Sequence, residues 1–204
     1  MPELPEVETV RSGLAGVVTG RTILGSRVLH PRPVRRHPGG PADFESVLVG
    51  RTFGEPRRRG KFLWLPLTDG DAVVAHLGMS GQFRSDVPDA PFAPNTRVLW
   101  DLDDGRQLRF VDQRMFGGVW LSPGGAELPS EVAHIALDPF DPSFNALAVA
   151  HRFRRLLAAA AIPHATSTVD TVVTASIGVA ALVAGRDRSS DVLIGEADKA
   201  LYQA

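Results

Sequence analysis

The sequence predicts an α+β protein in which an N-terminal helix precedes antiparallel strands, and a shorter helix–strand–helix segment follows them. Two Asp-Gly turns, at residues 69–70 and 104–105, each separate a pair of apolar runs, which is a strong local signal for a hairpin. Beyond Asn145 the pattern changes, because an alanine- and leucine-rich stretch is followed by β-branched residues. We therefore predict two domains, residues 1–145 and residues 146–204.

The composition is that of a globular protein of 204 residues, of which 44% are hydrophobic and 22% charged. The chain contains no cysteine, which excludes disulfides and thiolate metal sites, and its six histidines lack ligand spacing. We therefore expect no metal and no other cofactor. No apolar run approaches the roughly 20 residues of a membrane span, and the acidic N-terminus is unlike a signal peptide. These features predict a cytoplasmic protein without membrane contact.

The charge is nearly balanced, with a net value of −1 at pH 7, whereas nucleic-acid-binding proteins are usually basic. Any affinity for nucleic acid must therefore come from local clusters of basic side chains. The sequence contains two such clusters: Arg32, Arg35, Arg36 and His37, and then Arg57, Arg58, Arg59 and Lys61. Either cluster could be a solvated surface, and we favour the second as functional because it lies in a motif described below.

The first part of the N-terminal domain is expected to alternate between helix and strand. Val7, Val10 and Leu14 recur at helical spacing, which predicts a helix over Pro5–Val17 with one face toward a core. The elements expected next are a strand at Thr22–Leu29, a proline-, glycine- and arginine-rich loop at Pro31–Pro41, and a short helix at Ala42–Val49.

Strands dominate the rest of this domain. The first hairpin is predicted from Phe62–Leu67 and Ala72–His76, and the second from Val98–Leu102 and Gln107–Val111. A further strand at Gly118–Leu121 is expected to join the second hairpin.

The C-terminal domain is expected to hold two helices and one strand. Ala146–Ala161 is rich in alanine, leucine and arginine and predicts a helix, whereas Val169–Val183 is β-branched and predicts a strand. Ser189 or Ser190 could cap a last helix that runs through Tyr202.

The N-terminus carries the most specific chemical signal. If Met1 is removed, Pro2 presents a secondary amine, and the pKa of an α-amino group lies at about 7.7–8.0, so part of it is unprotonated at neutral pH. Such an amine attacks an aldehyde-like carbon to give an iminium ion, and Glu3 and Glu6 stand close by as acid/base groups. The alternative interpretation is an acidic helix start led by Pro5, and both interpretations can hold at once.

Residues Pro2–Val10 closely resemble the N-terminus of the formamidopyrimidine-DNA glycosylases, bifunctional repair enzymes that act on oxidised purines. The resemblance implies an N-terminal helix with a two-sheet β-sandwich, and it implies that Pro2 is the covalent nucleophile. It also implies that Glu3 protonates the sugar or leaving group, or shuttles protons, and that Glu6 supports it from the first helical turn.

The segment Arg57–Phe62 resembles the family's Arg-Arg-Gly-Lys motif, whose lysine is a proton donor in β-elimination. The matching residue here is Lys61, and the alternative is an ordinary basic turn before a strand.

The segment His76–Gly81 matches a second signature, in which the methionine fills the gap left by the extruded nucleotide. Met79 would take that role, and the alternative is a buried methionine after a strand.

The segment Asp112–Gly117 matches a third signature, in which an arginine pairs with the orphaned base and a phenylalanine wedges into the stack. Arg114 and Phe116 hold those positions, and the alternative is a surface arginine beside a core phenylalanine. The family also has a DNA-contacting histidine before the second hairpin. Asn95 stands in its place and could still hydrogen-bond a phosphate.

The later part of the chain departs from the family, because the expected helix–two-turn–helix and zinc finger have no counterpart in it. Residues 146–157, 172–180 and 197–202 instead resemble the C-terminal third of a GGDEF diguanylate cyclase domain, without its signature or metal carboxylates. The resemblances together imply a base-excision-repair glycosylase with AP lyase activity on damaged double-stranded DNA. The missing second domain implies that its binding to DNA is impaired. The alternatives are a catalytically inactive DNA-binding or interaction module and a cyclic-dinucleotide signalling remnant.

Overall fold

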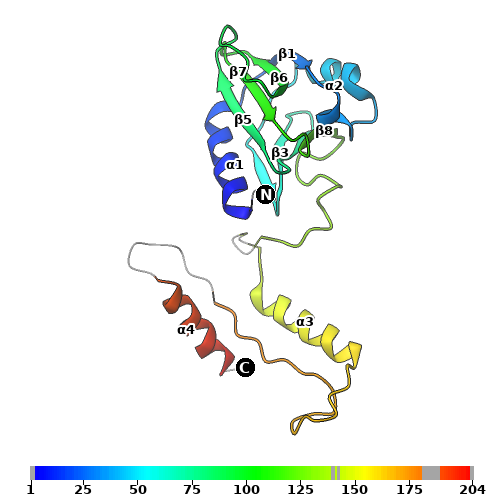
Figure 1. Ribbon diagram of the computed structural model, residues 1–204, viewed down its shortest axis with the longest axis vertical. Coiled ribbons are helices and arrows are strands. Elements are labelled where there is room, and N and C mark those ends of the chain that lie inside the picture. The colour runs from blue at the N-terminus through cyan, green and yellow to red at the C-terminus, as the bar shows by residue number, and fades with distance from the viewer. Residues whose placement is uncertain (1–2, 139–140, 142, 181–188, 203–204) are drawn as a thin grey trace. The chain divides into compact units, whose positions relative to one another are not determined.

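The computed structural model describes residues 3–138, 141, 143–180 and 189–202. It divides into two compact units, Met1–Asp138 and Pro139–Ala204, so the division falls before the predicted boundary at residue 145 (Figure 1).

The N-terminal unit is a sandwich of two four-stranded antiparallel sheets, with strand orders β1-β6-β7-β5 and β2-β3-β4-β8. Its elements are α1 (Leu4–Val18), β1 (Ile23–Val28), the 3-10 helix η1 (Arg32–Val34), α2 (Gly40–Leu48), β2 (Arg57–Arg59), β3 (Phe62–Pro66), β4 (Ala72–His76), β5 (Gly81–Asp86), β6 (Thr96–Leu102), β7 (Gln107–Asp112) and β8 (Gly118–Ser122). The α+β class with a two-sheet sandwich is therefore confirmed.

Helices cover both open sides of the sandwich. The α1 helix contacts β5 and β2, the edge strands of the two sheets, and α2 contacts β1 at the opposite edge (Figure 1). The η1 segment contacts β8, the remaining edge strand. This arrangement leaves η1 beside β8.

The helix α1 forms where the hydrophobic spacing predicts it. Val7, Leu14 and Val18 are buried along one face, and the Glu6 carboxylate accepts a hydrogen bond from the Glu3 N–H at 3.0 Å, as in a capping box. A proline within the first turn is compatible with a helix because the N–H groups there have no helical partner.

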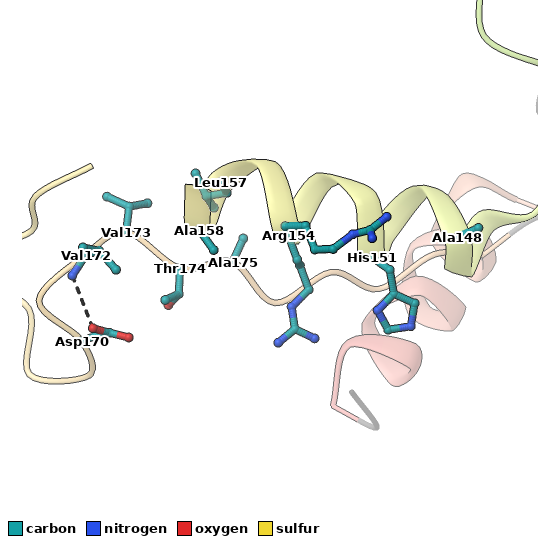
Figure 2. A pocket seen from close by; sticks show the side chains of 11 residues that line it. Ala148, His151, Arg154, Leu157, Ala158, Asp170, Val172, Val173, Thr174 and Ala175 are labelled. Atoms are coloured by element: carbon teal, nitrogen blue, oxygen red, sulfur yellow. Dashed lines mark hydrogen bonds between the residues drawn. The ribbon is translucent and has the colours of Figure 1, made fainter. Parts of the chain in front are cut away.

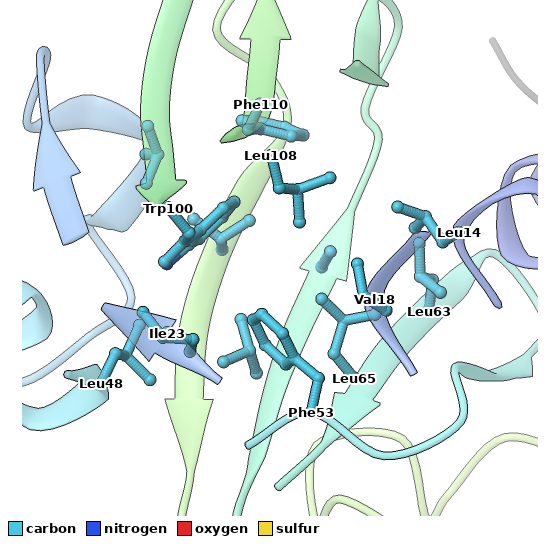
Figure 3. Packing of buried hydrophobic residues seen from close by; sticks show 14 of the residues in the cluster. Leu14, Val18, Ile23, Leu48, Phe53, Leu63, Leu65, Trp100, Leu108 and Phe110 are labelled. Atoms are coloured by element: carbon cyan, nitrogen blue, oxygen red, sulfur yellow. The ribbon is translucent and has the colours of Figure 1, made fainter. Parts of the chain in front are cut away.

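The core between the two sheets is built from alternate residues of the strands in each sheet. Leu63 and Leu65 from β3 face Trp100 from β6 and Phe110 from β7, all fully buried in one cluster (Figure 3). Burying each such side chain stabilises the fold by about 1.5–3 kcal/mol. The outer face of β3 and β4 is covered as well, in a smaller cluster that contains Trp64, Trp120 and Val132.

The two predicted hairpins are confirmed, but the pairing of the third strand is not as expected. The strand β8 pairs with β4 of the first hairpin rather than with the second hairpin. The predicted loop after β1 contains η1, and the strands β2 and β5 were missed. Both missed strands lie at sheet edges and consist mainly of polar residues, so they lack the apolar alternation of a central strand.

The C-terminal unit holds α3 (Ala146–Ala160) and α4 (Ser190–Leu201), at the positions predicted for two helices. The side chain of Asn145 caps α3 by accepting from the Ala148 N–H at 2.9 Å, whereas the side chain of Ser189 makes no such bond to α4. Neither helix contains a buried residue among those described.

The strand predicted at Val169–Val183 is not formed over its described part, and residues 181–183 lie outside the described residues. Val172 makes only an isolated bridge to Pro163. The physical reason is that a strand needs a neighbour to pair with, and the described residues of this unit provide no other strand.

Within the part of the chain that the structure describes, no helix is both long and apolar enough to cross a membrane.

Candidate nucleic-acid interface

The sheet register gathers three of the predicted motifs at one end of the sandwich. Phe62, next to Lys61, pairs with His76 at the end of β4, and His76 pairs with Gly118 at the start of β8. In the other sheet, Gly81 at the start of β5 pairs with Asp112 at the end of β7. The turn that carries Met79 and the loop that carries Arg114 therefore leave the sandwich side by side.

The start of α1 meets the turn between β2 and β3 through an ion pair. Lys61 Nζ lies 2.7 Å from Glu3 Oε2. The hydrogen bond and the positive charge of Lys61 hold the pKa of Glu3 below its usual range, so the carboxylate form is favoured. The structure thus brings two predicted catalytic residues together, while Pro2 lies outside the described residues.

Glu6 has a local role in the structure. Its Oε2 atom accepts the hydrogen bond from the Glu3 N–H, which fixes the backbone at the residue that pairs with Lys61.

The second basic cluster is largely engaged within the protein. Arg58 is bound to Glu8 at 3.0 Å and to Asp138 at 2.5 Å, and Arg57 is bound to Glu127 at 2.6 Å. These pairs tie β2 to α1 and to the end of the N-terminal unit. The preference for this whole cluster as the functional one was therefore too broad, because two of its arginines are ion-paired within the protein.

Met79 lies on a tight turn between β4 and β5, with 44% of its surface exposed. The turn depends on Gly78, whose φ of +61° suits glycine. A Cβ atom there would lie 2.4 Å from the Gly117 nitrogen, so the turn packs directly against the backbone of the neighbouring loop.

The loop of residues 113–117 presents the other two predicted DNA contacts. Arg114 Nη1 lies 3.3 Å from the sulfur of Met79, and Phe116 is 51% exposed. The expectation of a loop that presents this phenylalanine agrees with its exposure, and the alternative of a core phenylalanine does not. A cation, a thioether and an aromatic ring therefore share one surface.

A buried carboxylate holds the amide groups of this loop. Asp112 is fully buried and accepts from the Ser80 hydroxyl at 2.6 Å, the Gly117 N–H at 2.8 Å and the Arg114 N–H at 3.2 Å. Ser80 in turn accepts from the Arg114 N–H at 2.9 Å. Neither Asp112 nor Ser80 was singled out from the sequence, although each lies within a quoted motif.

The first basic cluster holds the carbonyl groups of the same loop, which the sequence analysis missed. Arg32 Nε donates to the Met115 carbonyl at 3.2 Å, and Arg35 donates to the carbonyls of Phe116 and Gly117 at 3.2 and 2.8 Å. The signal that could have found this pair is their three-residue spacing, which places both on one face of a short helical turn.

The other two members of this cluster are structural. The Arg36 guanidinium stacks on Trp120, 4.9 Å from the ring centroid, and His37 is buried with its Nε2 atom 2.6 Å from Asp43.

Asn95 lies near the base of the loop rather than beside the ion pair. Its side-chain oxygen accepts from Arg97 Nη2 at 2.9 Å, and its carbonyl accepts from the Asp112 N–H at 2.9 Å.

His76 is a further residue of this surface, and no sequence motif had marked it as a site residue. Its Nδ1 atom accepts from the Gly78 N–H at 3.2 Å, and its ring packs on Phe62. Burial lowers its pKa, and the charges of Arg36, Lys61 and Arg35 lower it further, so the neutral ring is favoured.

The C-terminal unit contains a cavity of about 780 Å³ between α3 and residues 170–175. Figure 2 shows that its lining includes His151, Arg154 and Asp170. None of the predicted site residues lines it, so it is separate from the chemistry inferred above.

Comparisons with known proteins agree with this geometry. A family model described as the formamidopyrimidine-DNA glycosylase N-terminal domain matches residues 1–119, and one described as the diguanylate cyclase GGDEF domain matches residues 135–204. The formamidopyrimidine-DNA glycosylase of Salinispora arenicola is 59% identical over 156 residues, covering 76% of this chain and 54% of the relative. That of Nocardioides sp. is 58% identical over 158 residues, with the same coverage. The chain spans about half the length of these relatives.

Solved structures of similar fold contain damaged DNA. Wild-type Lactococcus lactis Fpg (MutM), in complex with DNA that contains N7-benzyl-Fapy-dG, aligns with a TM-score of 0.56 at 33% identity, over 60% of this chain and 44% of that chain. MutM in complex with DNA that contains carbocyclic 8-oxo-G aligns with the same TM-score at 30% identity, over 65% and 46%. From the family match over residues 1–119 and these relatives, we conclude that the chain belongs to the formamidopyrimidine-DNA glycosylase N-terminal domain family.

Proposed function

We propose that the N-terminal unit carries the catalytic face of a base-excision-repair DNA glycosylase with AP lyase activity on oxidised purines. The observation that supports this most directly is the shared surface of Met79, Arg114 and Phe116 beside the Glu3–Lys61 ion pair. The relatives are named as formamidopyrimidine-DNA glycosylases, and the similar solved structures hold DNA with oxidised or abasic nucleotides. The proposal includes a cytoplasmic location, since the substrate is chromosomal DNA.

In this proposal Pro2, freed of Met1, attacks the sugar carbon that bears the damaged base. A bond forms between the Pro2 nitrogen and that carbon, the bond to the base breaks, and the base leaves with its bonding electron pair and gains a proton. The nitrogen then loses its proton, and the bond between that carbon and the ring oxygen breaks while the oxygen gains a proton. The opened sugar remains attached as an iminium ion, which withdraws electrons and makes the neighbouring proton acidic. Removal of that proton and loss of the 3′ phosphate complete β-elimination.

The ion pair supplies the proton transfers. The lowered pKa of Glu3 favours its carboxylate, which can accept a proton, whereas the adjacent Lys61 ammonium can donate one. Glu6 acts indirectly, because it holds the backbone of Glu3.

The remaining three residues stabilise the opened duplex: Met79 fills the gap, Arg114 meets the orphaned base and Phe116 wedges into the stack. Extrusion of a base costs a few kcal/mol of stacking, which such contacts offset. Asn95 is the weakest of the proposed DNA contacts, since its side chain already binds Arg97.

Borohydride trapping on a duplex with one abasic site tests the mechanism. We expect the full chain to form a covalent adduct and Pro2→Gly to form none. Lys61→Gln should form the adduct but, without borohydride, cleave the strand about a hundredfold more slowly because it lacks its acid. Arg106→Met is the matched control, since Arg106 is exposed in the hairpin turn at the other end of β7. An adduct of undiminished yield with Pro2→Gly would refute the role of Pro2.

Two other functions make different predictions. An inactive DNA-binding module would bind damaged duplex in a salt-sensitive manner, as phosphate contacts require, and would give no adduct.

A second proposal concerns residues 146–204, which we assign to a GGDEF-like fragment on the family match over residues 135–204. The sequence lacks the Gly-Gly-Asp-Glu-Phe signature, so we expect no turnover of GTP, and a turnover assay on the full chain tests this.

A further inference from the structure

The loop of residues 113–117 has an unusual backbone. Met115 adopts a φ of +55°, one of two non-glycine residues with positive φ among those described. A side chain in the left-handed region is strained, and such strain persists where the surrounding structure imposes it. The contacts around the loop show what imposes it.

Two arginines bind three consecutive carbonyl groups of the loop. Arg32 Nε binds the Met115 carbonyl, Arg35 Nη2 binds that of Phe116, and Arg35 Nη1 binds that of Gly117. Arg35 Nη1 also donates to the Arg32 carbonyl at 2.9 Å, which links the two arginines. Carbonyl groups at a protein surface ordinarily accept hydrogen bonds from water. Here Arg32 and Arg35 bind three consecutive carbonyl groups instead, and we call this arrangement the clamp.

The amide groups of the same loop are bound from the other side. The Asp112 carboxylate and the Ser80 hydroxyl accept from the N–H groups of Arg114 and Gly117. Cationic donors therefore hold the carbonyl groups while an anionic acceptor holds the amide groups, and charge assistance strengthens both sets of bonds.

We propose that Arg35 is a positioning residue that sets the conformation of residues 113–117 before DNA binds. Three of its five N–H donors are already committed to backbone carbonyls, so it is suited to hold the loop more than to bind a phosphate. The planar guanidinium reaches separate carbonyls from two nitrogens, which the single ammonium of a lysine cannot do. The consequence for DNA rests on the proposed function: Arg114 and Phe116 meet the duplex already ordered, which lowers the entropic cost of inserting them.

The first test uses the free protein, so it does not depend on activity. Hydrogen–deuterium exchange is followed for the peptide that spans residues 112–118 in the wild type, Arg35→Met, Arg35→Lys and Arg106→Met. We expect exchange about tenfold faster in both Arg35 variants, since loss of the clamp raises the population of the open loop, and no change in Arg106→Met. Circular dichroism of each variant verifies that the fold is intact. Exchange in both Arg35 variants equal to that of Arg106→Met overturns the proposal, and so does protection retained in Arg35→Lys, because charge alone would then suffice.

The second test adds a duplex with 2-aminopurine beside an abasic site, whose fluorescence rises when the base step is unstacked. At saturating protein, we expect the wild type and Arg106→Met to give the full rise, and both Arg35 variants to give it about tenfold more slowly. A full and equally fast rise in the Arg35 variants overturns the link between the clamp and insertion. If the wild type itself gives no rise and no trapped adduct, the proposed function fails, while the exchange result still decides the positioning role.

Discussion

Gly78 determines how closely the Met79 turn approaches the loop of residues 113–117. Its own φ is positive, and any side chain there would meet the backbone of Phe116 and Gly117 at 2.6 Å and 2.4 Å. Backbone atoms cannot move aside as the end of a flexible side chain can. The close approach of the Met79 turn to the backbone of this loop therefore depends on the absence of a side chain at Gly78.

His76 gives the surface a pH dependence whose sign can be worked out. The folded state lowers its pKa, chiefly by burial, whereas an unfolded chain has the ordinary value of about 6.5. Just below that pH the unfolded state therefore binds more protons than the folded state. The contribution of His76 to stability is thus complete above about pH 6.5 and is lost as the pH falls toward the lowered value.

Urea unfolding at about pH 7.5 and about pH 5.5 measures this contribution. We expect the wild type to lose more unfolding free energy on acidification than His76→Gln does. His134 is exposed, so His134→Gln is the control for the removal of a histidine elsewhere in the chain. Equal losses in the wild type and His76→Gln would contradict the prediction.

Sequence motifs marked several single residues as candidates, and their roles stay predictions. Met79, Arg114 and Phe116 follow from glycine-flanked motifs, and the structure gathers their elements in one place. Arg35 was noticed only as a member of a charge cluster, because its partners are carbonyl groups of a loop 81 and 82 positions later. The three-residue spacing of Arg32 and Arg35 marks them as a pair, but nothing in the residue types identifies the distant carbonyl groups that they bind.

The short strand β2 illustrates how an element with almost no apolar content is stabilised. Its residues are three arginines, and its hydrogen-bonded partner is β3. Arg58 is only 10% exposed and binds both Glu8 and Asp138, whereas Arg57 binds Glu127, which is 87% exposed. We therefore expect the two neighbouring arginines to differ in how much they contribute to the free energy of unfolding.

Replacing each arginine by methionine separates the two contributions. We expect Arg58→Met to lower the free energy of unfolding by about 2 kcal/mol, because it removes a mostly buried guanidinium that pairs with both Glu8 and Asp138. The matched Arg57→Met should change it by about 0.5 kcal/mol or less, as for an exposed ion pair. Urea denaturation followed by tryptophan fluorescence measures both, and equal losses would show that burial of Arg58 is unimportant.

The elements that were predicted well share a local signal. The hairpins have Asp-Gly turns, and α1 has helical spacing of apolar residues. The pairing of β8 with β4 has no such signal, because it depends on the packing of two sheets. The absence of a strand over the described part of Val169–Val183 is likewise a matter of partners, since β-branched composition favours a strand only where another strand is available to pair.

At the scale of the whole molecule, the two units differ in how much apolar surface they bury. In the N-terminal unit Leu65 is fully buried, whereas Leu156 on α3 of the C-terminal unit is 62% exposed. Large apolar side chains on α4, such as Ile194, are exposed as well. Cooperative stability must therefore come mainly from the N-terminal unit.

Alanine substitutions at two leucines test this asymmetry. We expect Leu65→Ala to lower the free energy of unfolding by about 3 kcal/mol, through the lost contacts and the cavity left behind. Leu156→Ala should change it by about 0.5 kcal/mol or less, since the side chain is mostly in water. Thermal unfolding of the full chain measures both, and a comparable loss from Leu156→Ala would contradict the assignment of stability to the N-terminal unit.

The placement of aromatic residues gives each unit its own optical signal. The three tryptophans, Trp64, Trp100 and Trp120, all lie in the two clusters of the N-terminal core, whereas the single tyrosine, Tyr202, lies in the C-terminal unit and is 86% exposed. Light at the red edge of aromatic absorption excites tryptophan alone, so emission excited there follows the sandwich without labelling or mutation. The ultraviolet absorption of the single phenol, at Tyr202, belongs to the other unit.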